Sequence, residues 1–264
     1  MPETLFLYLD FLGFRALSAS PAKVRRLFQT LDGCAIHRDS NFRTVVFSDT
    51  LLAYNSVNPI GEGYMWTELM YLIEFVQDIT HRLTGSGISF RALIRFGEFE
   101  YSRLQHVESY FGEALIASYD DESKLPATGL FLHKSVIPYN NIFQSAQFSD
   151  DYHYSFLAYD LTRLARDDFD YPVSPEVTMW SEAGIEERVL FQIQHLREIY
   201  DGTMHSNPLI RSKYLGSWSM YQRTYPRLVE VLVGSSFDPA SLCELDWSSA
   251  SESLRVQTSS FESP

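Results

Sequence analysis

The first half of the chain alternates between two hydrophobic periods, and each change of period marks a predicted element. A continuous apolar run over 5–9 ends in Asp10, which is typical of a buried strand that carries one charge to its rim. Two β-rich runs lie within 42–54 and meet at Ser48-Asp49-Thr50. They predict a hairpin with the Asp49 carboxylate at its tip.

Helical spacing follows in three segments. Apolar residues recur every three or four positions over 21–31, 66–83 and 113–124, which predicts three helices. Strand-like patterns over 88–101 and 128–136 alternate with them. The resulting order, β-α-ββ-α-β-α-β, predicts an α/β fold, an α+β sandwich in which helices cover one face of a mixed sheet.

The second half has a different character. One strand is predicted within 150–162 and helices over 185–201 and 207–224, and the serine and acidic content then rises. We therefore expect a core, an additional strand with a helical C-terminal extension packed on that core, and a partly disordered polar tail. Their expected boundaries are 1–140, 141–234 and 235–264.

Composition limits the class of protein. The chain has 264 residues, of which 45% are hydrophobic and 15% aromatic, enough for one large domain with a substantial core or for one domain with an appendage. Its formal charge of -13 argues against a broad nucleic-acid surface, which needs a basic stripe. A small polyanion remains compatible with this charge when metal ions and a few local cations offset the field.

The expected location is the cytoplasm. Cys34 and Cys243 fit no metal-binding spacing and indicate a reducing compartment. No apolar stretch reaches the roughly 18 residues of a membrane span, and the N-terminus lacks the pattern of a signal peptide. We expect no membrane partner.

Asp10 and Asp49 are the first candidates for chemistry. Two carboxylates at adjacent strand ends can share hard divalent cations, and such ions bridge phosphates. A nucleoside triphosphate site is therefore one reading of the pair. Aspartate is also common at strand ends and turns for local hydrogen bonding, which is the structural alternative.

Four segments, taken in order, resemble the class III nucleotidyl cyclase catalytic domain, the fold of adenylyl and guanylyl cyclases. The resemblance covers about 4–137. Each motif by itself is unspecific, and the resemblance depends on the order of the four motifs and on the spacing between them. The segments are Asp10-Phe11-Leu12-Gly13-Phe14, Phe47-Ser48-Asp49, Arg91-Ala92-Leu93-Ile94-Arg95-Phe96-Gly97-Glu98 and Tyr110-Phe111-Gly112-Glu113-Ala114-Leu115.

This resemblance implies a composite site in a homodimer. Asp10 and Asp49 match the aspartates that hold two Mn²⁺ or Mg²⁺ ions, and the Phe11 carbonyl matches a backbone ligand. One ion would activate the ribose 3'-hydroxyl and the other would bind the β- and γ-phosphates. The chemistry would be intramolecular phosphoryl transfer, which depends mainly on positioning and charge neutralisation.

The base-reading positions depart from the family. Adenylyl cyclases have a lysine and an aspartate where this chain has Val45 and Ser109, and guanylyl cyclases have a glutamate and commonly a cysteine. Without those groups a purine edge would stay unpaired, so we expect a pyrimidine. Arg43, one pleat from Val45 on the same strand face, would reach towards a one-ring base. Hydroxyls such as Thr50 and Ser109 can serve uracil or cytosine.

The transition-state positions depart as well. The family's asparagine and arginine on the next helix correspond to Ile116 and Asp120. Either the chain is a catalytically inactive relative, or another cation acts in place of the arginine. Arg91, Arg95 and Lys124 are the available cations, and each has the alternative reading of a surface ion pair. We expect Arg95 to be catalytic.

These departures, with both aspartates present, resemble the pyrimidine cyclases of the Pycsar antiphage system. That resemblance implies conversion of UTP to 3',5'-cyclic UMP and diphosphate, with the product acting on a separate effector. The alternatives are a cytidylate cyclase, an inactive nucleotide-binding regulator and a purine cyclase with rearranged base contacts. The expected substrate-binding residues are Phe11, Gly13, Phe14, Arg43, Val45, Thr50, Ser109 and Lys124.

Overall fold

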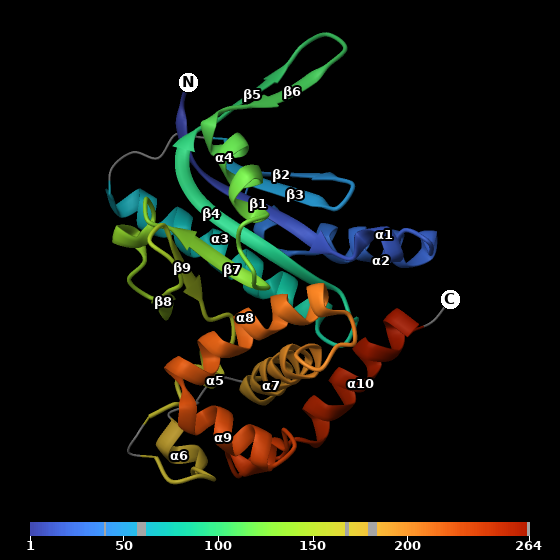
Figure 1. Cartoon of the computed structure of the whole chain (residues 1–264), viewed down its shortest axis with the longest axis vertical. Helices are drawn as coiled ribbons and strands as arrows, with labels where there is room; N and C mark the ends of the chain where they lie inside the picture. Colours follow the sequence, from blue (N-terminus) through green and yellow to red (C-terminus); the bar gives the residue numbers. More distant parts are fainter. Residues whose placement is uncertain (40, 57–61, 167–168, 179–183, 263–264) are drawn as a thin grey trace. The chain divides into compact units, whose positions relative to one another are not determined.

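The chain forms two compact units. The computed structural model describes residues 1–39, 41–56, 62–166, 169–178 and 184–262. One unit combines 1–79 with 89–155, and the other combines 80–88 with 156–264 (Figure 1). The first unit contains the predicted sheet, and the second is helical.

A seven-stranded mixed sheet forms the first unit, in the order β2-β3-β1-β4-β7-β9-β8. The β4–β7 pair is parallel and the other neighbours are antiparallel, which confirms the predicted mixed sheet. The strands are β1 Glu3–Leu12, β2 Phe42–Phe47, β3 Thr50–Asn55, β4 Ser89–Glu98, β7 Gly129–His133, β8 Ser145–Gln147 and β9 Tyr152–Ser155.

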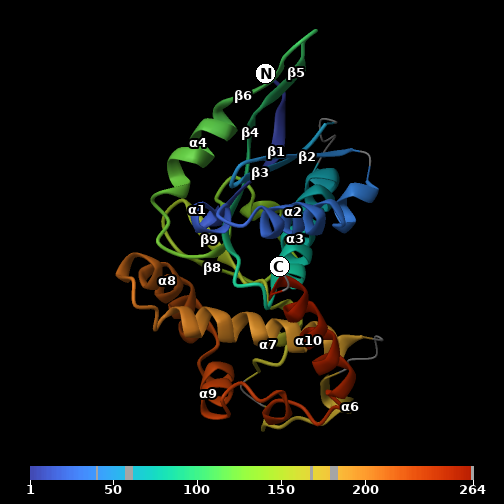
Figure 2. The same ribbon diagram turned by 90° about the vertical axis from the view of Figure 1, so that its right-hand side faces the viewer.

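The apolar run in β1 explains its central place. β1 pairs with β3 at one edge and β4 at the other, and helices cover both faces of the sheet (Figure 2), so Leu5 to Leu9 are buried without alternation. Figure 2 shows α4 (Glu113–Glu122) on one face of the sheet, with α2 (Pro21–Asp32) and α3 (Glu62–Leu83) on the other. Helices thus lie on both faces, whereas the pattern predicted one.

The helix predicted over 66–83 is confirmed as α3, which begins four residues earlier at Glu62. Its apolar positions are fully buried because they recur with the helical period and form one stripe. They are Leu69, Leu72, Ile73, Val76 and Ile79.

The strand predicted over 88–101 is divided. β4 ends at Glu98, and β5 (Glu100–Arg103) pairs with β6 (Glu108–Phe111) in a separate ribbon that projects from the sheet (Figures 1 and 2). Phe99 marks the break because its buried ring packs on Phe6 and Tyr54, each at a centroid distance of 4.7 Å. The shorter elements of this unit are α1 Phe14–Leu17, η1 Ala35–Arg38 and η2 Ile137–Tyr139.

The second unit is a group of helices. The predicted helices over 185–201 and 207–224 are confirmed as α7 and α8. The elements are α5 Tyr159–Thr162, α6 Pro175–Thr178, α7 Ile185–Gly202, α8 Pro208–Thr224, α9 Pro226–Gly234, η3 Pro239–Ser241 and α10 Ser248–Glu262.

The observed boundaries differ from the expected ones. The sheet takes in β8 and β9, so the first unit runs to Ser155 rather than to 140. Half of the expected polar tail is helix α10, whose Gln257 side chain donates to the carbonyl oxygens of His81 and Thr84 at 2.8 Å each. These contacts and the burial of Phe261 stabilise a serine-rich segment that composition alone marks as polar.

Candidate functional site

One row of paired residues crosses the sheet through five strands. Phe47 is opposite Thr50, Thr50 opposite Asp10, Asp10 opposite Arg91, and Arg91 opposite Gly129. Directly paired residues point to the same face of a sheet, so these side chains share one face. α4 packs on β1 and β4 within this sheet. Arg91 of this row contacts Glu122 of α4, so the row lies on the face that α4 covers (Figure 2).

Asp49 reaches this row through a tight turn. Ser48 and Asp49 form the two-residue connection of the β2–β3 hairpin, and Ser48 has a left-handed φ of 57° as such turns require. The Phe11 backbone N–H donates to the Asp49 carbonyl oxygen at 2.8 Å. The hairpin tip is thus attached to the end of β1, which brings Asp49 close to Asp10.

Tyr8 is a buried phenol on the same strand as Asp10. Burial raises the pKa of Tyr8, and the charges of Asp10, Glu122 and Asp49 raise it further, while a hydrogen bond with the Thr50 side chain lowers it. Tyr8 is two residues before Asp10 on β1 and therefore faces the same side. The charges of three acidic side chains thus act on this phenol.

Arg91 is the cation of the row. It is 2% exposed, and its Nε donates to the Ala127 carbonyl oxygen at 2.9 Å. Its Nη1 donates to the Glu122 backbone carbonyl and to the Glu122 carboxylate at the end of α4. Burial lowers the pKa of Arg91, and the charges of Glu122 and Asp10 oppose that shift.

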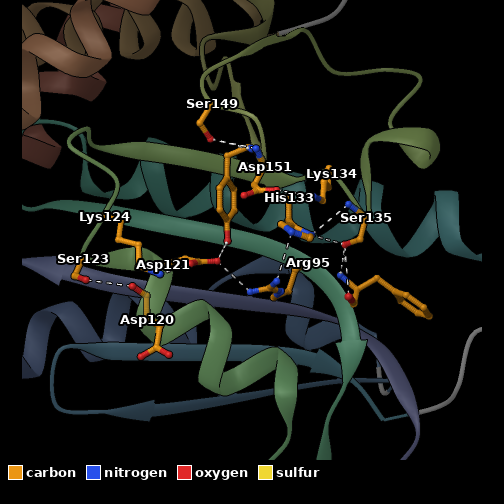
Figure 3. Close-up of polar contacts among 12 residues, drawn as sticks. Arg95, Asp120, Asp121, Ser123, Lys124, His133, Lys134, Ser135, Ser149 and Asp151 are labelled. Atoms are coloured by element: carbon orange, nitrogen blue, oxygen red, sulfur yellow. Dashed lines mark hydrogen bonds and ion pairs between the residues drawn. The ribbon is translucent and has the colours of Figure 1, made fainter.

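Arg95 belongs to a different network on the same strand (Figure 3). It is opposite Phe6, four residues beyond Arg91, which corresponds to about 13 Å along a strand. Its Nη1 is 3.4 Å from Asp121 Oδ2, and its Nη2 donates to His133 Nε2 at 3.5 Å. The register thus places Arg91, rather than Arg95, directly opposite Asp10.

The Arg95 network is closed by Tyr152, which is buried, and by Lys124, which is exposed. Tyr152 donates its hydroxyl to Asp121 Oδ2 at 2.7 Å, and Lys124 Nζ lies 2.9 Å from Asp121 Oδ1. Burial would raise the pKa of Asp121, but hydrogen bonds from Lys124 and Tyr152 lower it below its usual value. Burial, followed by the Arg95 charge, lowers the pKa of His133. Lys124 is thus paired with Asp121 in this network.

The remaining predicted residues divide into two groups. Gly13 and Phe14 follow β1; Gly13 has φ 74° and precedes α1, and Phe14 stacks on Phe28 with centroids 6.4 Å apart. Arg43 and Val45 lie on β2 opposite Tyr54 and Leu52. Since they alternate with the same period as Phe47, they face the side that carries Asp10.

Ser109 lies apart from this sheet. It is on β6 opposite Ser102, and its hydroxyl donates to the Ser102 carbonyl oxygen at 3.4 Å. The β5–β6 ribbon is separate from the seven-stranded sheet. One chain therefore presents Val45 and Ser109 on different sheets.

Phe47 was named from the sequence only as part of the segment Phe47-Ser48-Asp49, without a role, and Tyr8 and Glu122 were not singled out. Phe47 has 78% of its surface exposed although it is a large aromatic at the end of the row. In the sequence, the signal was an aromatic residue, Phe47, two positions before the candidate carboxylate Asp49. Tyr8 and Glu122 gave none, because their importance depends on strand register and on the docking of α4.

The donor set fits hard divalent cations only in part. Within the described ranges, no group of three or more His, Cys, Asp or Glu side chains is arranged to hold a metal ion. Asp10, Asp49 and backbone oxygens at the end of β1 supply two carboxylates and carbonyl donors. Mg²⁺ is commonly held by one or two carboxylates together with substrate phosphates, so this set is suited to a metal that arrives with a phosphate ligand.

No family model matches the chain, and a search of curated proteins finds no match. Solved structures are similar over 58% of this chain. The guanylate cyclase domain of RhGC from Catenaria anguillulae, in complex with GTP, has a TM-score of 0.44 and 13% identity over 96% of its length. A dimeric guanylyl cyclase domain of RhoGC from Blastocladiella emersonii has a TM-score of 0.44 and 13% identity over 93%. The adenylyl cyclase CyaB from P. aeruginosa has a TM-score of 0.43 and 10% identity over 93%.

Among the residues that the structure describes, no helix combines the length and the apolar character needed to cross a membrane.

Proposed function

We propose that the chain is a nucleotidyl cyclase that converts UTP to 3',5'-cyclic UMP and diphosphate. The observation that carries the proposal is the row in which Asp10 stands directly opposite Arg91, with the Asp49 turn bonded to the next residue, Phe11. This arrangement combines two carboxylates for divalent ions with one buried cation for phosphate. The motif order of class III cyclases supports the same reading.

Asp10 and Asp49 would hold two Mn²⁺ or Mg²⁺ ions, with the Phe11 carbonyl as a backbone ligand. When bound, such ions neutralise phosphate charge and lower the pKa of a coordinated hydroxyl. The chain's own contribution is to hold the two carboxylates at fixed separation. The Phe11–Asp49 backbone bond does so by fixing the backbone positions from which the two side chains extend.

Arg91 would bind a phosphate of the bound triphosphate. Its guanidinium is buried, and a charge in a low-dielectric surrounding acts more strongly than one in water. Glu122 and two backbone carbonyls already orient it, so little ordering is needed when substrate binds. In a chain of net charge -13, this local cation also offsets the repulsion of a polyanion.

The base site would favour a pyrimidine. Val45 offers no hydrogen bond to a purine edge, and Ser109 replaces an acidic group. Phe47 and Arg43 are exposed on the face of β2 that carries the row. An exposed ring and a guanidinium can stack on and pair with a one-ring base. UTP is preferred here on the resemblance to pyrimidine cyclases, and a cytidylate cyclase is the alternative.

A homodimer would complete the site. Large apolar side chains are exposed on the ribbon and on α4, which is a surface unusual for a monomer. A second copy covering this surface would bring its own ribbon, with Ser109, to the base end of the site. The exposed residues are Tyr101, Leu104, Val107, Phe111, Ile116 and Tyr119.

The biological setting follows from the resemblance alone. We propose a cytoplasmic enzyme of antiphage defence whose cyclic nucleotide acts on a separate effector, without nucleic-acid or membrane partners. Gly13, Phe14, Thr50 and Lys124 remain proposed substrate contacts.

An inactive nucleotide-binding regulator is the second candidate. Ile116, 62% exposed on α4, and Asp120 occupy the positions where cyclases have their transition-state groups. Arg95, the expected replacement cation, is bound to Asp121 and His133. These observations favour a chain that binds nucleotide without cyclising it.

A single competition assay separates the candidates. The purified protein is incubated with equal concentrations of UTP, CTP, ATP and GTP and with Mn²⁺, and the products are identified by mass spectrometry. Cyclic UMP should dominate, and the Asp10→Ala variant should make none. Dominant cyclic AMP or cyclic GMP would contradict the pyrimidine site. Binding of UTP without any cyclic product would favour the regulator.

A further inference from the structure

Three carboxylates lie at the C-terminal end of α4. Asp120, Asp121 and Glu122 are the last residues of this helix. The C-terminal end of a helix is the negative end of its dipole, so acidic side chains there destabilise the last turn. This turn is therefore stabilised by contacts from elsewhere in the fold.

Two arginines of β4 supply cations to the turn. Arg91 Nη1 donates to both the carboxylate and the backbone carbonyl of Glu122. Arg95 Nη1 lies 3.4 Å from Asp121 Oδ2. The two arginines are four residues apart on one strand, about 13 Å, whereas their acidic partners are neighbours in the chain. Their side chains thus converge on the end of α4 from opposite directions along β4.

Asp121 is held by two further donors. Tyr152 donates its hydroxyl to Asp121 Oδ2 at 2.7 Å, and Lys124 Nζ lies 2.9 Å from Asp121 Oδ1 (Figure 3). Lys124 is exposed, so its ion pair contributes little. Tyr152, on β9, is 4% exposed, and its ring makes a T-shaped contact with His133 at a centroid distance of 5.3 Å. The short bond from this packed ring is the firmest link between Asp121 and the sheet.

The position of Glu122 depends on that link. Asp121 and Glu122 share a peptide bond, so a turn that is fixed at Asp121 also fixes the Glu122 carbonyl and the base of its side chain. Arg91 uses both of these groups, and its Nε donates separately to the Ala127 carbonyl oxygen at 2.9 Å. A loosened turn would remove the two contacts that orient the end of the guanidinium.

We propose that Tyr152 is a positioning residue for the phosphate-binding cation Arg91. By holding Asp121, it fixes the end of α4 from which Glu122 orients the guanidinium. The inference rests on the proposed function, because it takes Arg91 as the residue that binds a substrate phosphate. A group that is correctly oriented for only part of the time lowers the apparent affinity by that fraction. Tyr152 thus acts on affinity for the triphosphate rather than on the chemical step.

The test measures binding of inorganic triphosphate with Mg²⁺ by isothermal titration calorimetry, in parallel with the kinetics of UTP cyclisation. Tyr152→Phe keeps the packed ring and removes the hydroxyl. We expect the dissociation constant of triphosphate and the KM for UTP each to rise about three- to tenfold, which corresponds to the loss of one hydrogen bond. Turnover at saturating UTP should change less than about twofold, because bound substrate restores the ordered turn.

Asp121→Ala removes the acceptor of the same bond, and it tests the inference if Tyr152→Phe fails to fold. It should weaken triphosphate binding at least as much, because Arg95 also loses its acidic partner. Tyr171→Phe is the matched control. Its hydroxyl donates to the Leu164 carbonyl oxygen at 2.6 Å in the helical unit, so its loss should lower the unfolding temperature and leave triphosphate affinity unchanged.

Two arginine variants test the route of the effect. In an Arg91→Lys background, Tyr152→Phe should cause little further loss of triphosphate affinity, since changes that affect one interaction are not additive. Arg95→Lys keeps a cation beside Asp121 and leaves the Tyr152 bond in place, so it should bind triphosphate like the wild type. Weaker binding by Arg95→Lys than by Tyr152→Phe would make Arg95 the main link and overturn the role of Tyr152.

The outcomes separate this inference from the proposed function. Wild-type protein that binds triphosphate and cyclises UTP, with Tyr152→Phe equal to it in triphosphate affinity, overturns the role of Tyr152 alone. An undiminished effect of Tyr152→Phe in the Arg91→Lys background also overturns it, because the hydroxyl would then act by another route. Wild-type protein that neither binds triphosphate nor forms a cyclic product overturns the proposed function and this role with it.

Discussion

Asp10 on β1 and Arg91 on β4 are direct cross-strand partners, so a carboxylate and a guanidinium stand side by side on one face of the sheet. Arg91 keeps its orientation through Ala127 and Glu122, and Asp10 lies between it and the Asp49 turn. This order places acidic and basic groups in sequence along a single row. Such a row suits a ligand that carries both metal ions and phosphates.

We expect Asp10→Ala and Asp49→Ala each to reduce cyclisation by more than about 100-fold, the scale seen when a main electrostatic stabiliser of a transition state is removed. Asp→Asn changes should be nearly as damaging, because an amide lacks the charge that hard cations need. Turnover is measured by mass spectrometry, and circular dichroism checks the fold. Asp151→Asn, at an exposed carboxylate paired with Lys134, is the control. Near-wild-type turnover of either alanine variant at saturating Mn²⁺ would contradict the assignment.

The two arginines of β4 should respond differently to conservative replacement. Arg91→Lys loses the planar donor set that contacts Glu122 and Ala127 and should reduce turnover more than about tenfold. Arg95→Lys should mainly lower the unfolding temperature, because its partners Asp121 and His133 lie away from Asp10. Steady-state kinetics and thermal melts of both variants provide the comparison. An active Arg91→Lys together with an inactive, stable Arg95→Lys would restore the catalytic role expected for Arg95.

The exposed apolar surface should be a dimer interface. Replacement of Leu104 on the ribbon connection, or of Tyr119 on α4, by aspartate should produce a monomer without cyclase activity, because a charge placed in an apolar interface is not solvated. Light scattering gives the mass, and the same sample is assayed. Leu209→Asp, at an exposed leucine in the helical unit, is the control and should remain dimeric. A fully active wild-type sample with the mass of one chain would rule the dimer out.

The base preference should depend on the positions that differ from purine cyclases. Val45→Lys combined with Ser109→Asp should weaken UTP turnover, because the new charged groups find no partner on a pyrimidine edge. We do not expect an efficient adenylyl cyclase, since Phe47 and Arg43, the proposed contacts of a one-ring base, are unchanged in this variant. The specificity constants for UTP, CTP and ATP are compared in the variant and the wild type. An unchanged UTP constant would place the base elsewhere.

Glu198 in the helical unit should make stability depend on pH. Burial raises the pKa of Glu198 from 4.5 to about 7, although the Gly85 N–H donates to it at 2.7 Å. The folded state thus holds a proton that the unfolded state releases, and this contribution is complete below pH 4.5 and lost as pH rises through about 7. We expect the unfolding free energy to fall by about 2–3 kcal/mol between pH 5 and 8, at about 1.4 kcal/mol per pKa unit.

Glu198→Gln keeps an acceptor for the Gly85 N–H and removes the titration. Its stability should be flat over this pH range and should exceed that of the wild type at pH 8. Denaturant unfolding at several pH values measures both curves. Parallel curves for variant and wild type would show that another group titrates.

Local patterns in the sequence determined most of the elements and the identity of the acidic candidates. The run Leu5–Leu9, the α3 stripe and the β2–β3 hairpin were predictable because hydrophobic period and turn residues act over a few neighbours. Asp10 and Asp49 were recognisable for the same reason: each ends or connects a strand.

Tertiary structure alone decided which groups meet. Arg91 and Arg95 lie on the same face of one strand and are equivalent by pattern, and only the register of β4 on β1 puts Arg91 opposite Asp10. The contact of Arg91 with Glu122 depends likewise on the docking of α4. The serine-rich segment became helix α10 through contacts such as those of Gln257 with His81 and Thr84. Register and docking arise from contacts between residues far apart in the chain, and no local period encodes them.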